Sequence, residues 1–235
     1  MFGANYSDGG VMGFRSASEI NQAMSRVYAY MGLATIVSML VSAVVGSNPE
    51  LVKFFFTGFM LWVTMLSPIA AVFFIVPFIG SNPPRAASIL ALLGFSALMG
   101  LSLAVMFAVY TLGSIFGAFM GASILFAVMS LYGYFTKKDL SSLGEMLFVA
   151  LIAIIIVSVI NLFLGSSLLQ MIISAVAILV FLGLTAYDTQ TIREMITQGD
   201  SDDGVEILGA LTLYLDFINL FINLLQLFGV AKGDD

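Results

Sequence analysis

Two aspartates, Asp188 and Asp216, stand inside long apolar runs and are the residues of this chain most able to do chemistry. Asp216 lies about eleven residues into the last apolar run, roughly 16 Å along a helix axis. An aspartate near the middle of a bilayer costs about 2.5–3.5 kcal/mol on insertion scales. The sequence places no lysine or arginine at that depth to offset the cost. Asp216 is therefore a candidate functional residue.

Asp188 is the expected partner of Asp216, because it lies in the preceding run, about four residues from its end, and the two runs cross a membrane in opposite directions. The carboxylates meet if one helix slides or tilts, or if the sixth helix continues to about Met195. Two carboxylates in a medium of low dielectric cannot both be charged cheaply, so the pair is expected to share a proton and to titrate as a unit. The residues alone leave two interpretations open, an ion or proton site and a structural hydrogen-bonded pair.

The same pair offers hard oxygen ligands of the kind that Ca²⁺ prefers. Calcium usually takes 6–8 oxygens, so carbonyl groups, Asn219 or water would have to complete the coordination. We expect such a site to be weak, which suits conduction better than storage.

A stripe of polar side chains runs along the last apolar segment. Thr212, Asp216, Asn219, Asn223 and Gln226 fall within a sector of about 80° on a helix. Such a stripe cannot face lipid without leaving hydrogen-bonding groups unsatisfied, so it is expected to face the bundle interior or water. These residues are candidates for lining a pathway, and the alternative is that they join neighbouring helices by hydrogen bonds.

The composition indicates that a lipid bilayer, rather than water, surrounds most of this chain. Hydrophobic residues make up 60% of the 235 positions and charged residues only 9%, whereas soluble chains average roughly 25% charged. A bilayer must therefore solvate the apolar excess. The chain has no cysteine and no histidine, so proton or metal chemistry is left to carboxylates. No basic patch suggests nucleic acid as a partner.

Apolar runs long enough to cross a bilayer predict an all-α membrane protein with seven transmembrane helices. The predicted spans are 27–46, 54–79, 88–110, 113–134, 146–164, 168–192 and 205–230. They divide the chain into an N-terminal segment (1–26), a transmembrane domain (27–230) and a short tail (231–235). The weakest break is 111–113, between the third and fourth spans.

The lysine and arginine residues are distributed unequally between the two sides of the membrane. Six of them fall on the side of the N-terminus, namely Arg15, Arg26, Arg85, Lys137, Lys138 and Arg193. Lys53 and Lys232 fall on the other side. This bias predicts a cytoplasmic N-terminus and an extracytoplasmic C-terminus, and it requires an odd number of spans.

Small and acidic residues elsewhere have plainer interpretations. Gly113, Gly117 and Gly121 share one helix face, and we expect them to let a neighbouring helix approach closely. Glu145 and Glu206 lie near span starts, where a carboxylate complements the helix dipole.

Three segments resemble the Bax inhibitor family of transmembrane proteins, and most closely its bacterial branch. They are 129–140, 181–192, which contains Thr-Ala-Tyr-Asp-Thr-Gln, and 208–221, which contains Tyr-Leu-Asp-Phe. The resemblance runs from about Ala23 to the end of the chain. It implies a seven-helix fold in which the last helix is central and six others surround it, in a bacterial inner membrane.

The resemblance also implies a function. The family's di-aspartyl sensor maps by motif onto Asp188 and Asp216, and in members studied for transport it couples protonation to a calcium leak. Some members carry an arginine in the second span that interacts with the pair, but residues 54–79 of this chain contain no charged residue. Bacterial relatives have also been linked to a membrane quality-control protease, as its substrate or modulator.

Two hypotheses follow. The first is a pH-sensitive cation leak for calcium or protons, gated by the aspartate pair, with no cofactor beyond transient calcium. The second is a non-transporting regulatory protein that binds a membrane protease. We expect no enzymatic activity. Two aspartates can share a catalytic proton, as in aspartic proteases, but the Gly-x-Gly-Asp run of intramembrane proteases is absent because Leu-Tyr-Leu precedes Asp216.

Overall fold

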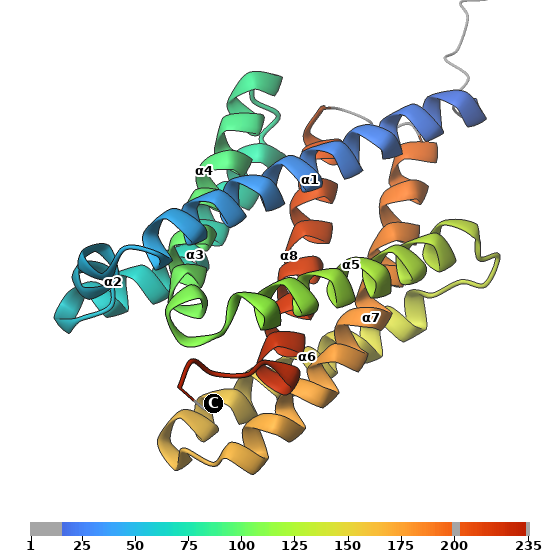
Figure 1. The fold of residues 1–235 in the computed structure, drawn as a ribbon. Helices are drawn as coiled ribbons and strands as arrows, with labels where there is room; N and C mark the ends of the chain where they lie inside the picture. Colours follow the sequence, from blue (N-terminus) through green and yellow to red (C-terminus); the bar gives the residue numbers. More distant parts are fainter. Residues whose placement is uncertain (1–15, 199–202, 234–235) are drawn as a thin grey trace, which may run out of the picture.

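The computed structural model describes residues 16–198 and 203–233. This part of the chain is all-α, as predicted, and Figure 1 shows its helices. The helices are α1 (Ala17–Gly46), α2 (Pro49–Phe55), α3 (Gly58–Gly80), α4 (Arg85–Val109), α5 (Leu112–Phe135), α6 (Ser141–Leu164), α7 (Ser167–Thr197) and α8 (Asp203–Phe228). All except α2 are long and apolar enough to span a membrane, which confirms the prediction of seven transmembrane helices.

The first helix begins at Ala17, earlier than the predicted start at 27. Ser16 caps it, since the Ser16 side chain accepts a hydrogen bond from Glu19 N, and the Glu19 carboxylate accepts one from Ser16 N (2.8 Å). The apolar-run criterion misses these turns because they are polar outside and bury only residues such as Ile20 and Met24. Part of the predicted N-terminal segment is thus helical, and its residues 1–15 lie outside the described residues.

A short helix, α2, occupies the place where the second span was predicted to begin. Asn48 Oδ1 accepts a hydrogen bond from Glu50 N (3.0 Å), and Pro49 fills the first helical position, where its missing N–H costs nothing. The spanning helix α3 starts only at Gly58, whose φ of 57° suits glycine. The second span is therefore shorter than predicted.

The last helix, α8, is central, as predicted. Of its most apolar stretch 67% is buried, compared with 44% for α7 and 33% or less for each other span. It packs against α1, α3, α4, α5 and α7, and it crosses the middle of the bundle in Figure 1. The remaining helix, α6, packs on α7 and faces α8 across a cavity.

The charged residues gather at two ends of the bundle. Arg26 and Arg85 both contact Glu206 at the start of α8. We call this end, where α1, α4, α6 and α8 begin, the basic end. Lys53 and Lys232 line one cavity of about 690 Å³ at the opposite end.

The tail closes against the junction of α4 and α5. Thr111 N donates to Val230 O (3.1 Å), and Lys232 N donates to Val109 O (2.8 Å). The break predicted at 111–113 is present, because α4 ends at Val109 and α5 begins at Leu112. Residues 234–235 of the predicted tail lie outside the described residues.

The prediction that Gly113, Gly117 and Gly121 bring helices together needs correction. A Cβ added at Gly113 or Gly117 meets no atom within 4 Å, and at Gly121 it meets only Leu224 Cδ1, at 3.7 Å. Regular spacing shows that residues share a face, but it does not show whether another helix lies there. The close approach on α5 is instead at Gly133, where a Cβ would lie 2.8 Å from the carbonyl carbon of Ala186.

Candidate functional site

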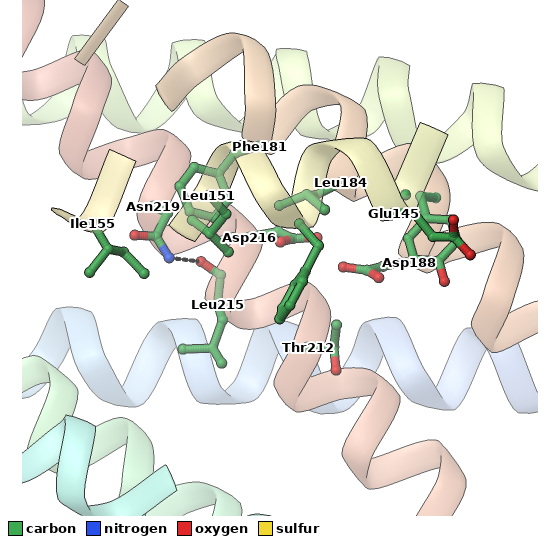
Figure 2. Close-up of a pocket in the computed structure, with 13 residues that line it drawn as sticks. Glu145, Leu151, Ile155, Phe181, Leu184, Asp188, Thr212, Leu215, Asp216 and Asn219 are labelled. Atoms are coloured by element: carbon green, nitrogen blue, oxygen red, sulfur yellow. Dashed lines mark hydrogen bonds between the residues drawn. The ribbon is translucent and has the colours of Figure 1, made fainter. Parts of the chain in front are cut away.

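The length of α7 decides whether the two aspartates meet. The helix continues to Thr197, past the predicted end at 192. Asp188 therefore lies about nine residues, or ~14 Å, from the basic end of α7, and Asp216 lies ~20 Å from the start of α8. Because α7 and α8 pack together in opposite directions, the two carboxyl groups come within hydrogen-bonding reach of each other, side by side in Figure 2.

Asp216 is among the most deeply buried polar residues of this region. Its exposed fraction is 5%, whereas Asp188 is only partly buried. Asp216 Oδ2 is buried and receives no hydrogen bond from a donor in the described residues. A buried acceptor without a partner is costly. It is satisfied by a proton shared with Asp188 or by a species that enters from outside.

A cavity of about 570 Å³ between α6, α7 and α8 gives such a species access. Its walls are mainly apolar, and its polar lining consists of Glu145 from α6, Tyr187 and Asp188 from α7, and Thr212, Asp216 and Asn219 from α8. Figure 2 shows Glu145 beside Asp188, with Asp216 farther along α8. The cavity thus connects an exposed carboxylate with a buried one.

The position of α6 follows from Gln190. Leu140 N donates to Gln190 Oε1 (2.9 Å), and Gln190 Nε2 donates to Lys138 O (2.8 Å). These two bonds fix the loop before α6 about two turns below the end of α7. Glu145 therefore lies near the level of Asp188 rather than at the end of the bundle.

Two further contacts complete the start of α6. A Cβ at Gly144 would lie 2.6 Å from ring atoms of Tyr187, so glycine is required for α6 to lie against that ring. Asp139 Oδ1 accepts a hydrogen bond from Ser141 N (2.8 Å). The hydrogen bonds from Ser141 hold the pKa of this exposed carboxyl group below its usual value.

Two of the four uncharged residues in the predicted polar stripe line the cavity. Thr212 and Asn219 line it, each donating to its own helix: Thr212 Oγ1 to Leu208 O (3.1 Å) and Asn219 Nδ2 to Leu215 O (2.8 Å). The hydrogen-bonding needs of both side chains are thus partly met without a neighbouring helix.

Asn223 and Gln226, which were also predicted to line a pathway, lie outside this cavity. Asn223 Nδ2 donates to Asn219 O (2.8 Å). Gln226 Oε1 accepts hydrogen bonds from Gln170 Nε2 (2.9 Å) and Ser174 Oγ (3.1 Å). The side chains of α7 close over the stripe here, so Gln226 joins helices, which was the alternative interpretation of these amides.

No cation neutralises the aspartate pair in the part of the chain that the structure describes. The ion pairs there join Arg26 and Arg85 to Glu206. The described residues also hold no group of three carboxylates near enough to bind a metal together. A cation in this cavity would be coordinated by the pair with carbonyl or water oxygens.

Glu206 has a larger role than its position near a helix start predicted. Arg26 Nε donates to Glu206 Oε2 (2.7 Å), Arg26 Nη2 bonds to Oε1, and Arg85 Nη2 lies 3.7 Å from Oε2. Arg85 also donates to Tyr30 OH (2.6 Å). Arg26 and Arg85 are far from Glu206 in the sequence, so no local pattern indicates that they pair. The sequence assigned the two arginines only to one side of the membrane.

A seven-helix membrane bundle with a carboxylate pair between its two most buried helices is the class of protein that this fold and site define. The family model described as "Inhibitor of apoptosis-promoting Bax1" matches residues 20–233. The chain belongs to this family, the Bax inhibitor family, as its motifs indicated.

Similar proteins are found in several bacteria. The inner membrane protein YbhL of Escherichia coli K12 is 37% identical over 211 residues, covering 88% of this chain and 90% of YbhL. An uncharacterised membrane protein of Streptococcus pyogenes serotype M1 is 35% identical over 220 residues, which is 89% of this chain and 93% of the relative. An uncharacterised protein of Rickettsia prowazekii, RP147, is 39% identical and covers 88% of each chain.

Proposed function

We propose that this protein is a pH-sensitive cation pathway, with calcium as the expected ion and Asp188 and Asp216 as its sensor and transient ligands. The observation that supports the proposal is the buried Asp216, which lines a cavity of about 570 Å³ and whose Oδ2 has no donor among the described residues. We also propose a bacterial inner membrane as its location, as the name of YbhL states for that relative. The basic end would face the cytoplasm.

The pair links protonation to opening. While it holds one proton, the two carboxyl groups hydrogen-bond and keep α7 against α8. Without that proton, two like charges share a site of low dielectric, and they either separate or bind a cation. A divalent cation satisfies both, so we expect conduction to rise as the pH rises and the shared proton is lost.

Conduction needs movement at the opposite end of α7 and α8. The hydrogen bonds of Gln226 with Gln170 and Ser174 join the helices beyond the cavity. The described conformation is therefore the closed one in this proposal, and opening would part these amides.

Calcium flux into liposomes that contain the full chain tests the proposal. Asp216→Asn and Asp188→Asn remove one charge at nearly constant volume. We expect each to lower flux by about tenfold or more and to flatten its dependence on pH, because a charged ligand is lost. Glu50→Gln, which alters an exposed carboxylate on α2, is the control and should conduct as the unmodified chain does.

Unchanged flux and pH dependence in both aspartate variants would refute the proposal. If the unmodified chain carries no calcium and the same variants only lower its thermal stability, the carboxylates are structural. That result would favour the regulatory hypothesis, in which the protein binds a membrane protease.

A further inference from the structure

A third carboxylate, Glu145, shares the cavity with the aspartate pair. Its side chain is exposed, and it lies on α6 beside Asp188 (Figure 2). We infer that Glu145 is the mouth of the pathway: it attracts cations in the basic half of the bundle, near the level of Asp188, and passes them along the cavity to Asp188 and Asp216. This inference rests on the proposed function and names the side from which the site fills.

The burial of the three carboxylates supports this direction. Glu145 is exposed, Asp188 is partly buried, and Asp216 is only 5% exposed, although all three line one cavity. Asp216 Oδ2 has no donor among the described residues, so the inner end of the cavity takes a proton shared with Asp188 or a cation. A species that reaches it through this cavity passes Glu145 first.

The three carboxylates act in series. The described residues contain no group of three acidic side chains that could hold one metal ion. Glu145 therefore does not complete a coordination shell with the pair. It acts through its field on a cation that is still hydrated, before the pair binds that cation.

Basic residues gather near the start of α6 and the end of α7. Lys137 and Lys138 are exposed in the loop just before α6, and Arg193 lies one turn beyond Gln190 on α7. These positive charges repel approaching cations. Asp139, which follows Lys138 in the sequence, is engaged by Ser141 N and does not line the cavity. Glu145, which lies farther along α6, does line it.

The natural absence of cysteine allows a direct test that does not depend on flux. Thr212→Cys places a single thiol on the cavity wall, one turn of α8 before Asp216. The full chain in lipid nanodiscs is treated with methanethiosulfonate reagents of positive and negative charge, and the ratio of their labelling rates is measured. This ratio reports the electrostatic potential at Thr212.

We expect Glu145→Gln to lower the ratio of cationic to anionic labelling by about fivefold or more, since one unit charge near a partly dehydrated path is lost. The matched control is Glu194→Gln, which removes an exposed carboxylate near the same end that does not line the cavity. It should leave the ratio within about twofold of the unmodified chain, because solvent screens its charge. Asn219→Cys, on the same wall, replaces Thr212→Cys if that variant does not fold.

Each outcome decides the inference. A fall in the ratio for Glu145→Gln alone supports it. Equal ratios for the two glutamate variants overturn it, and so does a thiol that neither reagent reaches, because the cavity is then closed to water. If Glu145→Gln lowers the ratio but Asp216→Asn leaves calcium flux unchanged, the mouth exists and the proposed function is wrong.

Discussion

At the scale of single residues, the aspartate that is most costly to place in a membrane, Asp216, lies where the protein buries it most completely. Asp216 lies on the most buried helix, and one of its oxygens has no donor among the described residues. A purely structural carboxyl group would be expected to satisfy both oxygens, because an unmet buried acceptor costs about 1–3 kcal/mol. A proton shared with Asp188 or a bound cation would each meet this acceptor, and the calcium-flux experiment distinguishes the two.

Glu206 differs from Asp216 because it is a buried carboxylate that forms ion pairs, with Arg26 and Arg85. We expect Glu206→Gln to lower the free energy of unfolding by about 2 kcal/mol, because Arg26 and Arg85 then face a neutral amide. Their side chains are 40% and 39% exposed, so water offsets part of the loss. Thermal unfolding in mild detergent measures the change.

A double-mutant cycle with Arg26→Gln separates the ion pair from the other effects. The loss in the double variant should be smaller than the sum of the two single losses, since each single change already breaks the pair. Additive losses would show that Glu206 stabilises the protein in another way, for example through the dipole of α8.

At the scale of helices, contacts rather than spacing decide what a glycine does. Gly133→Ala places a Cβ 2.8 Å from the carbonyl carbon of Ala186, and backbone cannot move aside cheaply. We expect it to destabilise the packing of α5 on α7 by about 1–3 kcal/mol. Gly117→Ala on the same helix meets no atom within 4 Å and should be neutral or stabilising by up to about 1 kcal/mol.

Thermal unfolding of the two variants side by side is the measurement. The helix and the substitution are the same, so the two variants differ in what surrounds the added Cβ, which is exposed at Gly117 and buried against α7 at Gly133. Equal effects in the two variants would mean that α5 does not approach α7 at Gly133 as described.

At the scale of the molecule, we expect the basic end to set the orientation in the membrane. Lys53 and Lys138 are exposed at opposite ends. In a chain without cysteine, Lys53→Cys should react with an impermeant maleimide on intact bacterial cells, and Lys138→Cys should react only after permeabilisation, because the end richer in arginine and lysine stays inside. If Lys138→Cys instead reacts on intact cells and Lys53→Cys reacts only after permeabilisation, the basic end faces the outside. The side of the membrane from which Glu145 is proposed to admit cations would then be reversed.

The sequence alone was enough for the membrane, the seven spans and the choice of the two aspartates as candidate residues. Long apolar runs and the cost of a buried aspartate are local properties, so Asp216 was recognisable without a structure. The central position of α8 was implied by the family resemblance, and the burial of α8 confirms it.

Only the tertiary structure decided which polar residues share a cavity. Thr212 and Asn219 line it, whereas Gln226 bonds to α7, although all three belong to one helical stripe. The reason is that helical periodicity fixes an angle on one helix but not the height at which its neighbours begin or cross. Gln190 fixes that height for α6 and so brings Glu145 beside Asp188. The two aspartates were evident as costly residues in the chain, and the structure made them a pair with a cavity and a third carboxylate at its mouth.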